Sequence, residues 1–481
     1  MRERDYMKLK GKALAALVAV GALTLAACGG SSDTASESAA GGDTSTEASE
    51  SSGDTADTGD AGAAEGDAAA TSDNPAAANC TILGPGAKPP RAGGDKYIVY
   101  ATSLNIGNSW QEEAYNTARG VASMPPYNEC VEVRTARDEP DPQAQISQIQ
   151  SMVAAGADGI ISYALSPTAI NAAYQEACDA GVTVVVYDAT ATNPCVYNVS
   201  YITSVPQGVD GELVENPFMG YNAMDQLLQL MGGPGEIFVS HGVVGTSTDI
   251  VHYGSALAAM ENYAGTEILT EYEGRWDSAQ QQKETAKALG SFPNVQGIFG
   301  GYGESGVVKA LDAVGKEIPV SGETSNYFRL RLLDGYPGVS IGSPPSQGAI
   351  GMKVMLAVIL NGPDGIPHDI EVPYRIVTAA NVTECKQAAD EPATEYCNVF
   401  PAGVVGDENT ADIFNEMAPE VSLLMAQTGE PTPNIEATPY TAEYLQQFEQ
   451  DPSRRYITRE TCPDGWTKGM LPQNVEGCVQ S

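Results

Sequence analysis

Short apolar runs alternate with amphipathic stretches along most of this chain, and this alternation limits the possible folds more than any other feature. The runs at residues 97–100, 159–162 and 182–187 have the length and β-branched content of buried strands. Helical spacing fills segments between them, such as residues 110–121 and 167–180. Strand–helix alternation predicts βαβ units, in which helices cover both faces of a parallel sheet.

The alternation breaks near residues 205–211 and then resumes. The second block carries the following expected elements: helices at 218–230, 249–263, 279–289 and 305–314, and strands at 235–240, 266–272, 295–299 and 318–321. Another strand–helix unit follows at 339–342 and 348–360. Two successive blocks of roughly domain size favour two similar α/β lobes over one continuous sheet.

The first 28 residues have the order of a secretory signal, with basic residues, then an apolar stretch, then Leu25-Ala26-Ala27-Cys28. This last run is similar to the lipobox of bacterial lipoproteins. The resemblance implies cleavage before Cys28 and lipidation of Cys28, which would anchor the protein at the extracytoplasmic face of the cell membrane. The alternative is an uncleaved transmembrane helix, but residues 13–27 are short for a span that needs about 20 residues.

Charge is strongly negative, with 62 acidic and 25 basic residues and a net charge of −37. That balance argues against nucleic acid or an anionic lipid surface as a partner. Residues 28–79 are rich in Ser, Thr, Gly, Ala and acidic residues and contain no Lys or Arg. We expect a disordered acidic linker there, between the lipid anchor and the folded body.

Eight cysteines remain when Cys28 is set aside, and an even number in an exported chain suggests disulfides. Connectivity is open, and joining neighbours in order gives one guess: Cys80–Cys130, Cys178–Cys195, Cys385–Cys397 and Cys462–Cys478. There is no Cys-x-x-Cys motif, and the three histidines are scattered. No metal site and no cofactor is therefore expected.

Several short segments together resemble the type I periplasmic binding proteins, in particular the ribose-binding branch of sugar-binding lipoproteins of ABC transporters. They are GNSWQ at 107–111, GADGII at 156–161, AGVTVVVYD at 180–188, GTS at 245–247 and NVQGIF at 294–299. The resemblance covers about residues 96–380. It implies two doubly wound parallel-sheet lobes joined by three crossover segments, with a hinge and a ligand cleft between the lobes.

The domain organisation follows from this resemblance. We expect a signal peptide at 1–27, the anchor and linker at 28–79, one lobe from 80–205 with 344–375, and a second lobe at 206–343. Residues 376–481 exceed what the family fold needs, and they contain four cysteines and helical patches at 411–417 and 440–448. This extension is either a disulfide-stapled wrap around the lobes or a docking surface for a permease or another partner.

Ligands of open parallel sheets lie beyond the carboxyl ends of the strands, so residues directly after strands are candidates. In the first lobe these are Asn108, Trp110, Tyr163 and Asp188. Trp110 can stack on the apolar face of a sugar, and Asn108 can bond hydroxyl groups. Asp188 lies where the family has a carboxylate that accepts two sugar hydroxyls. The alternatives are a core role for Trp110, a surface position for Tyr163 and a turn or helix cap for Asp188.

The second lobe contributes the candidates Asp249, His252, Tyr302, Glu304 and Glu323. The family carries an arginine near the first two positions, and this chain has none there. A cleft that contains the carboxylates Asp188, Glu304 and Glu323 and no matching base favours a neutral sugar or cyclic polyol, with a cationic ligand as the alternative, and disfavours an acidic ligand.

Residues 301–306 read G-x-G-x-x-G, and Glu323 follows about 20 residues later, which matches a dinucleotide fingerprint. Because the motif lies within the second lobe of an exported chain, a tight turn at the cleft is the favoured interpretation. No complete nucleophile elbow is present, so we do not expect an enzyme. The leading hypothesis is capture of a solute for an ABC transporter permease, with a ligand-sensing receptor or an extracytoplasmic enzyme as alternatives.

Overall fold

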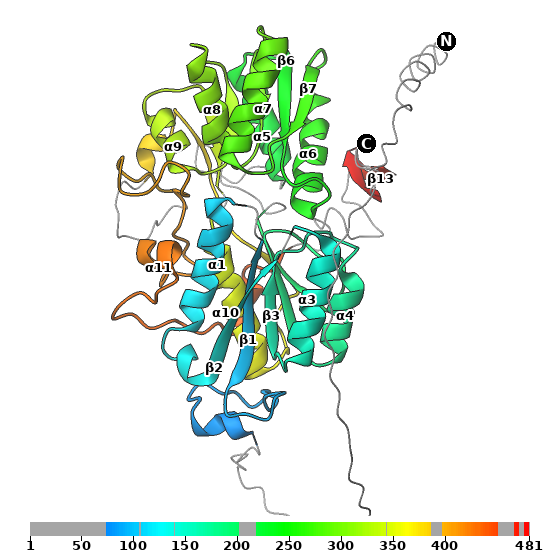
Figure 1. Ribbon diagram of the computed structural model, residues 1–481, viewed down its shortest axis with the longest axis vertical. Coiled ribbons are helices and arrows are strands. Elements are labelled where there is room, and N and C mark those ends of the chain that lie inside the picture. Colours follow the sequence, from blue (N-terminus) through cyan, green and yellow to red (C-terminus); the bar gives the residue numbers. More distant parts are fainter. Residues whose placement is uncertain are drawn as a thin grey trace, which may run out of the picture. The chain divides into compact units, whose positions relative to one another are not determined.

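A computed structural model describes residues 74–104, 107–138, 140–201, 218–342, 344–385, 397–450, 466–470 and 476–480 (Figure 1). All of them belong to one compact unit, Ala69–Ser481. The predicted signal peptide, Cys28 and most of the predicted linker lie outside the described residues. Within the described part of the chain, no helix has both the length and the apolar character needed to cross a membrane.

The first lobe is built on a six-stranded parallel sheet with the order β11-β5-β4-β3-β1-β2. Its strands are β1 (Tyr97–Leu104), β2 (Val131–Asp138), β3 (Gly159–Ser162), β4 (Thr183–Tyr187), β5 (Tyr197–Ser200) and β11 (Asp369–Glu371). β3 is buried along its whole length. This burial on both faces explains why its sequence is continuously apolar rather than alternating.

Helices cover both faces of this sheet (Figure 1). They are α1 (Ser109–Ala122), α2 (Tyr127–Cys130), α3 (Pro142–Ala154), α4 (Asn171–Asp179) and α10 (Gln347–Asn361), preceded by a 3₁₀ turn, η1 (Pro75–Ala78). α1 packs on α10, and α3 packs on α4. Asn108 and Asp141 cap α1 and α3 by accepting hydrogen bonds from backbone N–H groups, which favours helix initiation at these points.

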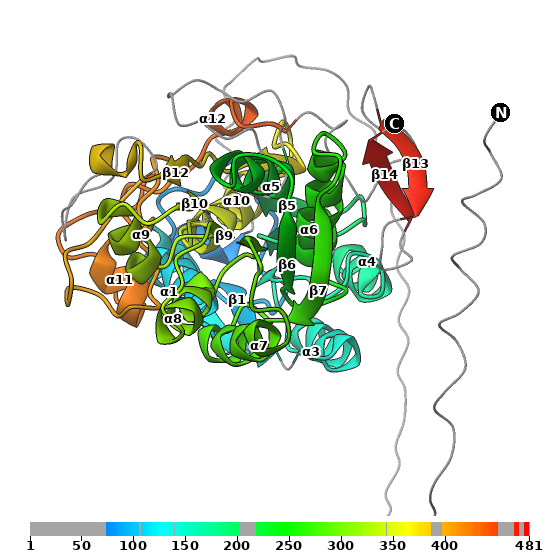
Figure 2. The same cartoon turned by 90° about the horizontal axis from the view of Figure 1, so that it is seen from above.

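The second lobe repeats this architecture with the strand order β12-β10-β9-β8-β6-β7. Its strands are β6 (Glu236–His241), β7 (Glu267–Glu273), β8 (Gly297–Phe299), β9 (Val320–Gly322), β10 (Gly338–Ile341) and the antiparallel edge strand β12 (Ile376–Thr378). Its helices are α5 (Met219–Leu230), α6 (Ser247–Met260), α7 (Ser278–Ser291), α8 (Glu304–Ala313) and α9 (Asn326–Leu333). α5 and α6 pack together on one face of the sheet, and α7 and α8 on the other (Figure 2). The two-lobed type I fold expected from the sequence is therefore present.

The chain moves between the two sheets after β5, after β10 and after β11. Most of the first passage, residues 202–217, lies outside the described residues. The last passage is the segment between Glu371 and Ile376. β12 therefore belongs to the second sheet, although the sequence analysis assigned residue 376 onward to the extension. Its backbone pairs with β10, which completes the edge of that sheet.

The rest of the extension is mostly irregular, with η2 (Val382–Glu384), α11 (Leu423–Thr428), α12 (Ala442–Gln446) and the antiparallel pair β13 (Trp466–Met470) and β14 (Glu476–Gln480). The predicted helix at 411–417 is wrong. The N–H of Ala411 donates to the carbonyl of Thr324 in the second lobe instead of continuing a helix. The Asp412 carboxylate accepts hydrogen bonds from Arg329 and from the N–H of Asn398, which holds this segment against α9.

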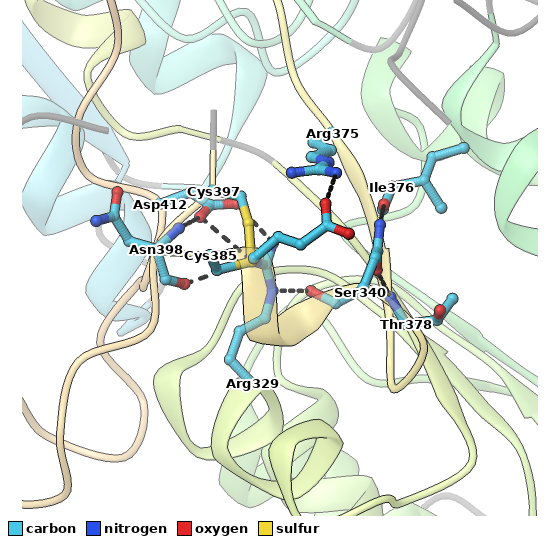
Figure 3. Close-up of a disulfide and its surroundings, with 11 residues drawn as sticks. Arg329, Ser340, Arg375, Ile376, Thr378, Cys385, Cys397, Asn398 and Asp412 are labelled. Carbon is cyan, nitrogen blue, oxygen red and sulfur yellow. Dashed lines mark hydrogen bonds and ion pairs between the residues drawn. A yellow bond between two sulfur atoms is a disulfide. The ribbon is translucent and has the colours of Figure 1, made fainter. Parts of the chain in front are cut away.

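Three disulfides join consecutive cysteines, as the sequence analysis guessed: Cys80–Cys130, Cys178–Cys195 and Cys385–Cys397. Figure 3 shows the last of these beside Arg329, Ser340 and Asp412. Both cysteines of this disulfide belong to a buried apolar cluster of the second lobe, which also contains Phe328 and Leu332 of α9. Cys462 lies outside the described residues, so its pairing with Cys478 stays a prediction.

Candidate ligand-binding site

A small cavity lies between the two lobes, at the carboxyl ends of their strands. The first lobe lines it with Asn108, Trp110, Gln111, Asp188 and Tyr201, and the second lobe with Thr248, Trp276, Tyr302 and Glu323. Its volume is about 20 Å³, which is room for a water molecule rather than for a sugar. The two lobes are therefore in a closed arrangement, and they must separate or shift to admit a larger ligand.

Trp110 forms the wall that α1 contributes. It lies in the first turn of this helix, is 4% exposed and stacks on Tyr187 with ring centroids 6.3 Å apart. Asn108 caps the same helix by accepting a hydrogen bond from the N–H of Gln111 at 2.8 Å. The cap fixes where α1 begins and so places both side chains beside the cavity.

Asp188 follows β4 and has a left-handed backbone conformation, with φ of 62°. Two hydrogen bonds hold its backbone. The N–H of Asp188 donates to the carbonyl of Val199, and the hydroxyl of Ser200 donates to the carbonyl of Asp188. The side chain is 5% exposed, and Oδ1 has no hydrogen-bond partner among the described residues. Burial, and secondarily the negative charge of Glu323, raises the pKa of Asp188 well above its usual value.

Glu323 is the matching carboxylate of the second lobe and follows β9. Its Oε1 accepts a hydrogen bond from the N–H of Tyr302 at 3.0 Å. Its Oε2 accepts one from the hydroxyl of Tyr201 at 3.4 Å, which joins the two lobes across the cavity. Asp188 and Glu323 therefore approach the same space from opposite lobes.

Trp276 supplies the second indole of the site and follows β7. Both Arg275 and Trp276 have positive φ angles, 57° and 55°, which side chains of this size rarely adopt. The indole lies against Gly242, where an added Cβ would come within 1.9 Å of the ring. Gly242 thus provides the space that lets Trp276 reach the cavity.

Five of the sequence-predicted residues line this cavity: Asn108, Trp110, Asp188, Tyr302 and Glu323. The other four lie outside its lining. Tyr163 is fully buried and donates its hydroxyl hydrogen bond to Thr248 at 3.1 Å. Tyr163 therefore supports a lining residue from behind.

Asp249 accepts a hydrogen bond from the N–H of Gly242 at 2.8 Å, and its carboxylate lies 3.5 Å from Nδ1 of His241. His252 is buried against Phe299, with ring centroids 4.7 Å apart, and burial lowers its pKa to about 4. Glu304 accepts hydrogen bonds from the N–H and hydroxyl of Ser325, and burial raises its pKa to about 7.

Four lining residues were not predicted from the sequence: Gln111, Tyr201, Thr248 and Trp276. Trp276 follows a strand that was expected, so the same positional rule applied to the segment 274–277 would have found it. Gln111 and Thr248 lie next to residues that were chosen, in the first turns of α1 and α6. Tyr201 follows β5, a strand that was not expected.

Part of the extension, residues 407–412, bonds to both lobes, and we call it the strap. On the first lobe, the Glu113 carboxylate of α1 accepts hydrogen bonds from Asn409 Nδ2 at 2.6 Å and from the Thr410 N–H at 3.1 Å. On the second lobe, Lys309 of α8 pairs with Glu408 at 2.8 Å. The N–H of Asn326 also donates to the carbonyl of Asn409. The strap is thus an additional link between the lobes, separate from the crossover segments.

Two α/β lobes with aromatic and carboxylate side chains converging on a cavity between them define a two-lobed ligand-binding protein. Residues 99–363 match the family described as periplasmic binding protein domain. Because this match covers more than half of the 481 residues, the chain belongs to the periplasmic binding protein family. Members of this family bind solutes and are not enzymes, which argues against the alternative hypothesis of an extracytoplasmic enzyme.

Individual relatives agree with this assignment. A Rhizobium meliloti protein that is named for rhizopine binding is 23% identical over 265 residues, which cover 51% of this chain and 79% of that protein. An ABC transporter solute-binding protein of Thermobispora bispora is 26% identical, with a TM-score of 0.50 over 59% of this chain and 84% of its own.

A solute-binding protein of Bacillus halodurans with bound myo-inositol shares the fold at 20% identity and a TM-score of 0.51, over 60% of this chain and 96% of its own. One of Actinobacillus succinogenes with bound D-allose does so at 20% identity and a TM-score of 0.50, over 60% of this chain and all of its own.

Proposed function

We propose that this protein is an extracytoplasmic solute-binding lipoprotein that captures a small polyhydroxylated ring, a sugar or a cyclic polyol, and delivers it to an ABC importer. The observation that carries this proposal is the interlobe cavity, where two indoles face a space bordered by Asp188 and Glu323. Indoles stack on the apolar faces of such rings, and carboxylates accept hydrogen bonds from their hydroxyls.

The relatives support this choice of ligand and partner. The Bacillus halodurans and Actinobacillus succinogenes proteins were solved with myo-inositol and D-allose, and both are described as ABC transporter proteins. The Thermobispora bispora protein is also described as an ABC transporter solute-binding protein. A permease that recognises the closed pair of lobes is the partner this function requires.

A thermal-shift screen of sugars, cyclic polyols, amino acids and nucleosides tests the ligand class. A ligand that binds only the folded state raises the melting temperature, so sugars or cyclic polyols should give the largest shifts. Asp188→Ala should abolish the shift of the best ligand, whereas the exposed control Asp334→Ala should retain it. If only amino acids or nucleosides raise the melting temperature, or if Asp188→Ala has no effect, the proposal fails.

Membrane attachment through Cys28 is the second part of the proposal. In a bacterial host, the full-length protein should partition with the membrane fraction and gain the mass of a lipid on Cys28. Cys28→Ser should lose the lipid and leave the membrane fraction, because one residue supplies the acylated sulfur. A Cys28→Ser protein that still carries lipid, or a wild-type protein that carries none, would refute the anchor.

A further inference from the structure

The second lobe holds the indole of Trp276 through a turn with an unusual backbone. This turn, residues 274–277, joins β7 to α7, and it contains the two consecutive residues with positive φ, Arg275 and Trp276. Such conformations persist only where the surrounding structure maintains them. The carbonyl of His241 accepts hydrogen bonds from the N–H of Gly274 at 2.9 Å and from the N–H of Arg275 at 3.0 Å. The end of β6 therefore holds the turn where it leaves β7.

The turn is also fixed where it enters α7. The carboxylate of Asp277 caps this helix by accepting a hydrogen bond from the N–H of Gln280 at 2.6 Å. An added Cβ at Gly274 would come within 2.3 Å of the Ser240 hydroxyl oxygen, so the turn packs against β6 as closely as a glycine allows. Both ends of the turn are thus tied to elements of the second lobe.

Gly242 follows β6 and lies against the indole itself. An added Cβ would come within 1.9 Å of Cε2 and 2.1 Å of Cζ2 of Trp276, which are distances that nonbonded atoms do not reach. Gly242 is not among the glycines with a positive φ, so this position needs a glycine for space rather than for backbone conformation. Asp249 of α6 fixes the Gly242 backbone, because its carboxylate accepts the N–H of Gly242 at 2.8 Å.

These contacts to the turn and to the indole all come from the second lobe, so opening of the lobes leaves them intact. Among the described residues, Trp276 lines the cavity and Gly242 does not. A side chain that is already held in its binding position loses little entropy when the ligand arrives, and this favours affinity.

We infer that Gly242 is a positioning residue for ligand binding. It keeps the indole of Trp276 in place to stack on a ring before the lobes close, although it does not itself line the cavity. This inference rests on the proposed function, namely that a ring binds between the lobes. It also gives Asp249 a role, because this carboxylate holds Gly242 and does not contact the ligand.

A double-mutant cycle tests the inference by isothermal titration calorimetry, with the sugar or cyclic polyol that gives the largest thermal shift. Gly242→Ala and Trp276→Ala should each weaken binding at least tenfold, because each takes the indole away from the ring. In the Trp276→Ala background, Gly242→Ala should weaken binding less than threefold, since no indole is left to displace. The control Gly290→Ala of α7, where an added Cβ would meet nothing within 4 Å, should keep wild-type affinity.

Tryptophan fluorescence of the ligand-free protein gives a second readout. Trp276 is 6% exposed, so Gly242→Ala should shift the emission to longer wavelength as the displaced indole meets water, and Gly290→Ala should not. Trp276→Ala and the double variant should have the same emission. If circular dichroism shows that Gly242→Ala does not fold, the double variant carries the test. It should fold, because the clashing atoms are gone, and bind within threefold of Trp276→Ala.

The outcomes separate the inference from the proposed function. If the wild type binds a ring and Gly242→Ala weakens it less than tenfold, the inference is overturned while the proposed function stands. A loss of threefold or more in the Trp276→Ala background also overturns it, because Gly242 would then act through the lobe and not through the indole. If the wild type binds no ring, the proposed function fails and the inference fails with it.

Discussion

The buried carboxyl group of Glu113, which contacts the strap, makes the stability of the protein depend on pH. Its carboxylate lies on α1, is 2% exposed and faces Asn409 and Thr410 of the strap, with Tyr302 also close enough to interact electrostatically. Burial raises its pKa from 4.5 to about 7, although the two strap hydrogen bonds oppose this shift. A carboxyl group with a raised pKa in the folded state holds its proton more tightly there than in the unfolded chain.

The sign of the pH effect follows from this difference. Glu113 contributes stability that is fully present below about pH 4.5 and is lost as the pH rises through about 7. Between pH 5 and pH 8 the loss amounts to about 2 kcal/mol for this group alone. Glu113→Gln cannot ionise, so its free energy of unfolding relative to wild type should increase by that amount over the same range. Urea unfolding at both pH values measures it.

The neighbouring Glu112→Gln is the matched control, because Glu112 lies on the same helix with its side chain 48% exposed. Its free energy of unfolding should stay parallel to that of wild type from pH 5 to pH 8. A Glu113→Gln protein with the same pH dependence as wild type would show that this carboxyl group does not titrate in the window.

A residue of the binding site could be predicted from the sequence only where the strand that precedes it could be predicted. Asp188 follows an apolar strand, Glu323 follows a short buried strand, and a side chain that follows a parallel strand lies at the edge where ligands bind. Asp249 and Glu304 satisfy the same rule but turn toward Gly242 and Ser325 instead of the cavity. The direction of a side chain after a strand depends on local hydrogen bonds between segments distant in sequence, which the sequence pattern does not contain.

At the scale of elements, most strands and helices of both lobes were predictable because each short apolar run there is followed by a segment with helical spacing. β5, β11 and β12 lie beside the crossovers between the lobes, outside this alternation, and the extension has few periodic segments. Its conformation is set by bonds to the lobes, as with Ala411 and Thr324. Tertiary contacts of this kind override local helical spacing, which is why the helix expected at 411–417 does not form.

Two buried ion pairs attach the extension to the lobes. Arg329 of α9 pairs with Asp412 at 2.6 Å on the second lobe, as Figure 3 shows, and Lys353 of α10 pairs with Glu420 at 2.7 Å on the first lobe. Lys353 also lies 4.1 Å from the centre of the Tyr440 ring. Removing one partner of such a pair leaves a buried charge without compensation, which is strongly destabilising.

Lys353→Met should therefore lower the free energy of unfolding by about 3–5 kcal/mol, because it leaves the buried Glu420 carboxylate without a compensating positive charge. The double variant Lys353→Met/Glu420→Leu should recover most of that loss, since it removes the buried charge as well. Lys283→Met, at a position where the side chain is 71% exposed, is the control and should change stability little. Urea unfolding measures all three, and a double variant no more stable than Lys353→Met would contradict this account of the pair.

At the scale of the whole molecule, ligand capture requires the lobes to move while remaining linked. Ser109 of the first lobe and Tyr302 of the second bond at 2.7 Å, and Thr190 and Ser247 bond at 2.6 Å across the lobes. The strap adds bonds to α1 and to α8. Opening the cavity must break the direct contacts and at least one set of strap bonds, so the extension stabilises the closed arrangement seen here.

A crystal structure of the protein with the sugar or cyclic polyol that gives the largest thermal shift tests the central claim most directly. The account predicts the ring between Trp110 and Trp276, with its polar groups within hydrogen-bonding distance of both Asp188 and Glu323, and therefore in contact with both lobes. A ring bound on one lobe alone, or at a site away from these four residues, would contradict it.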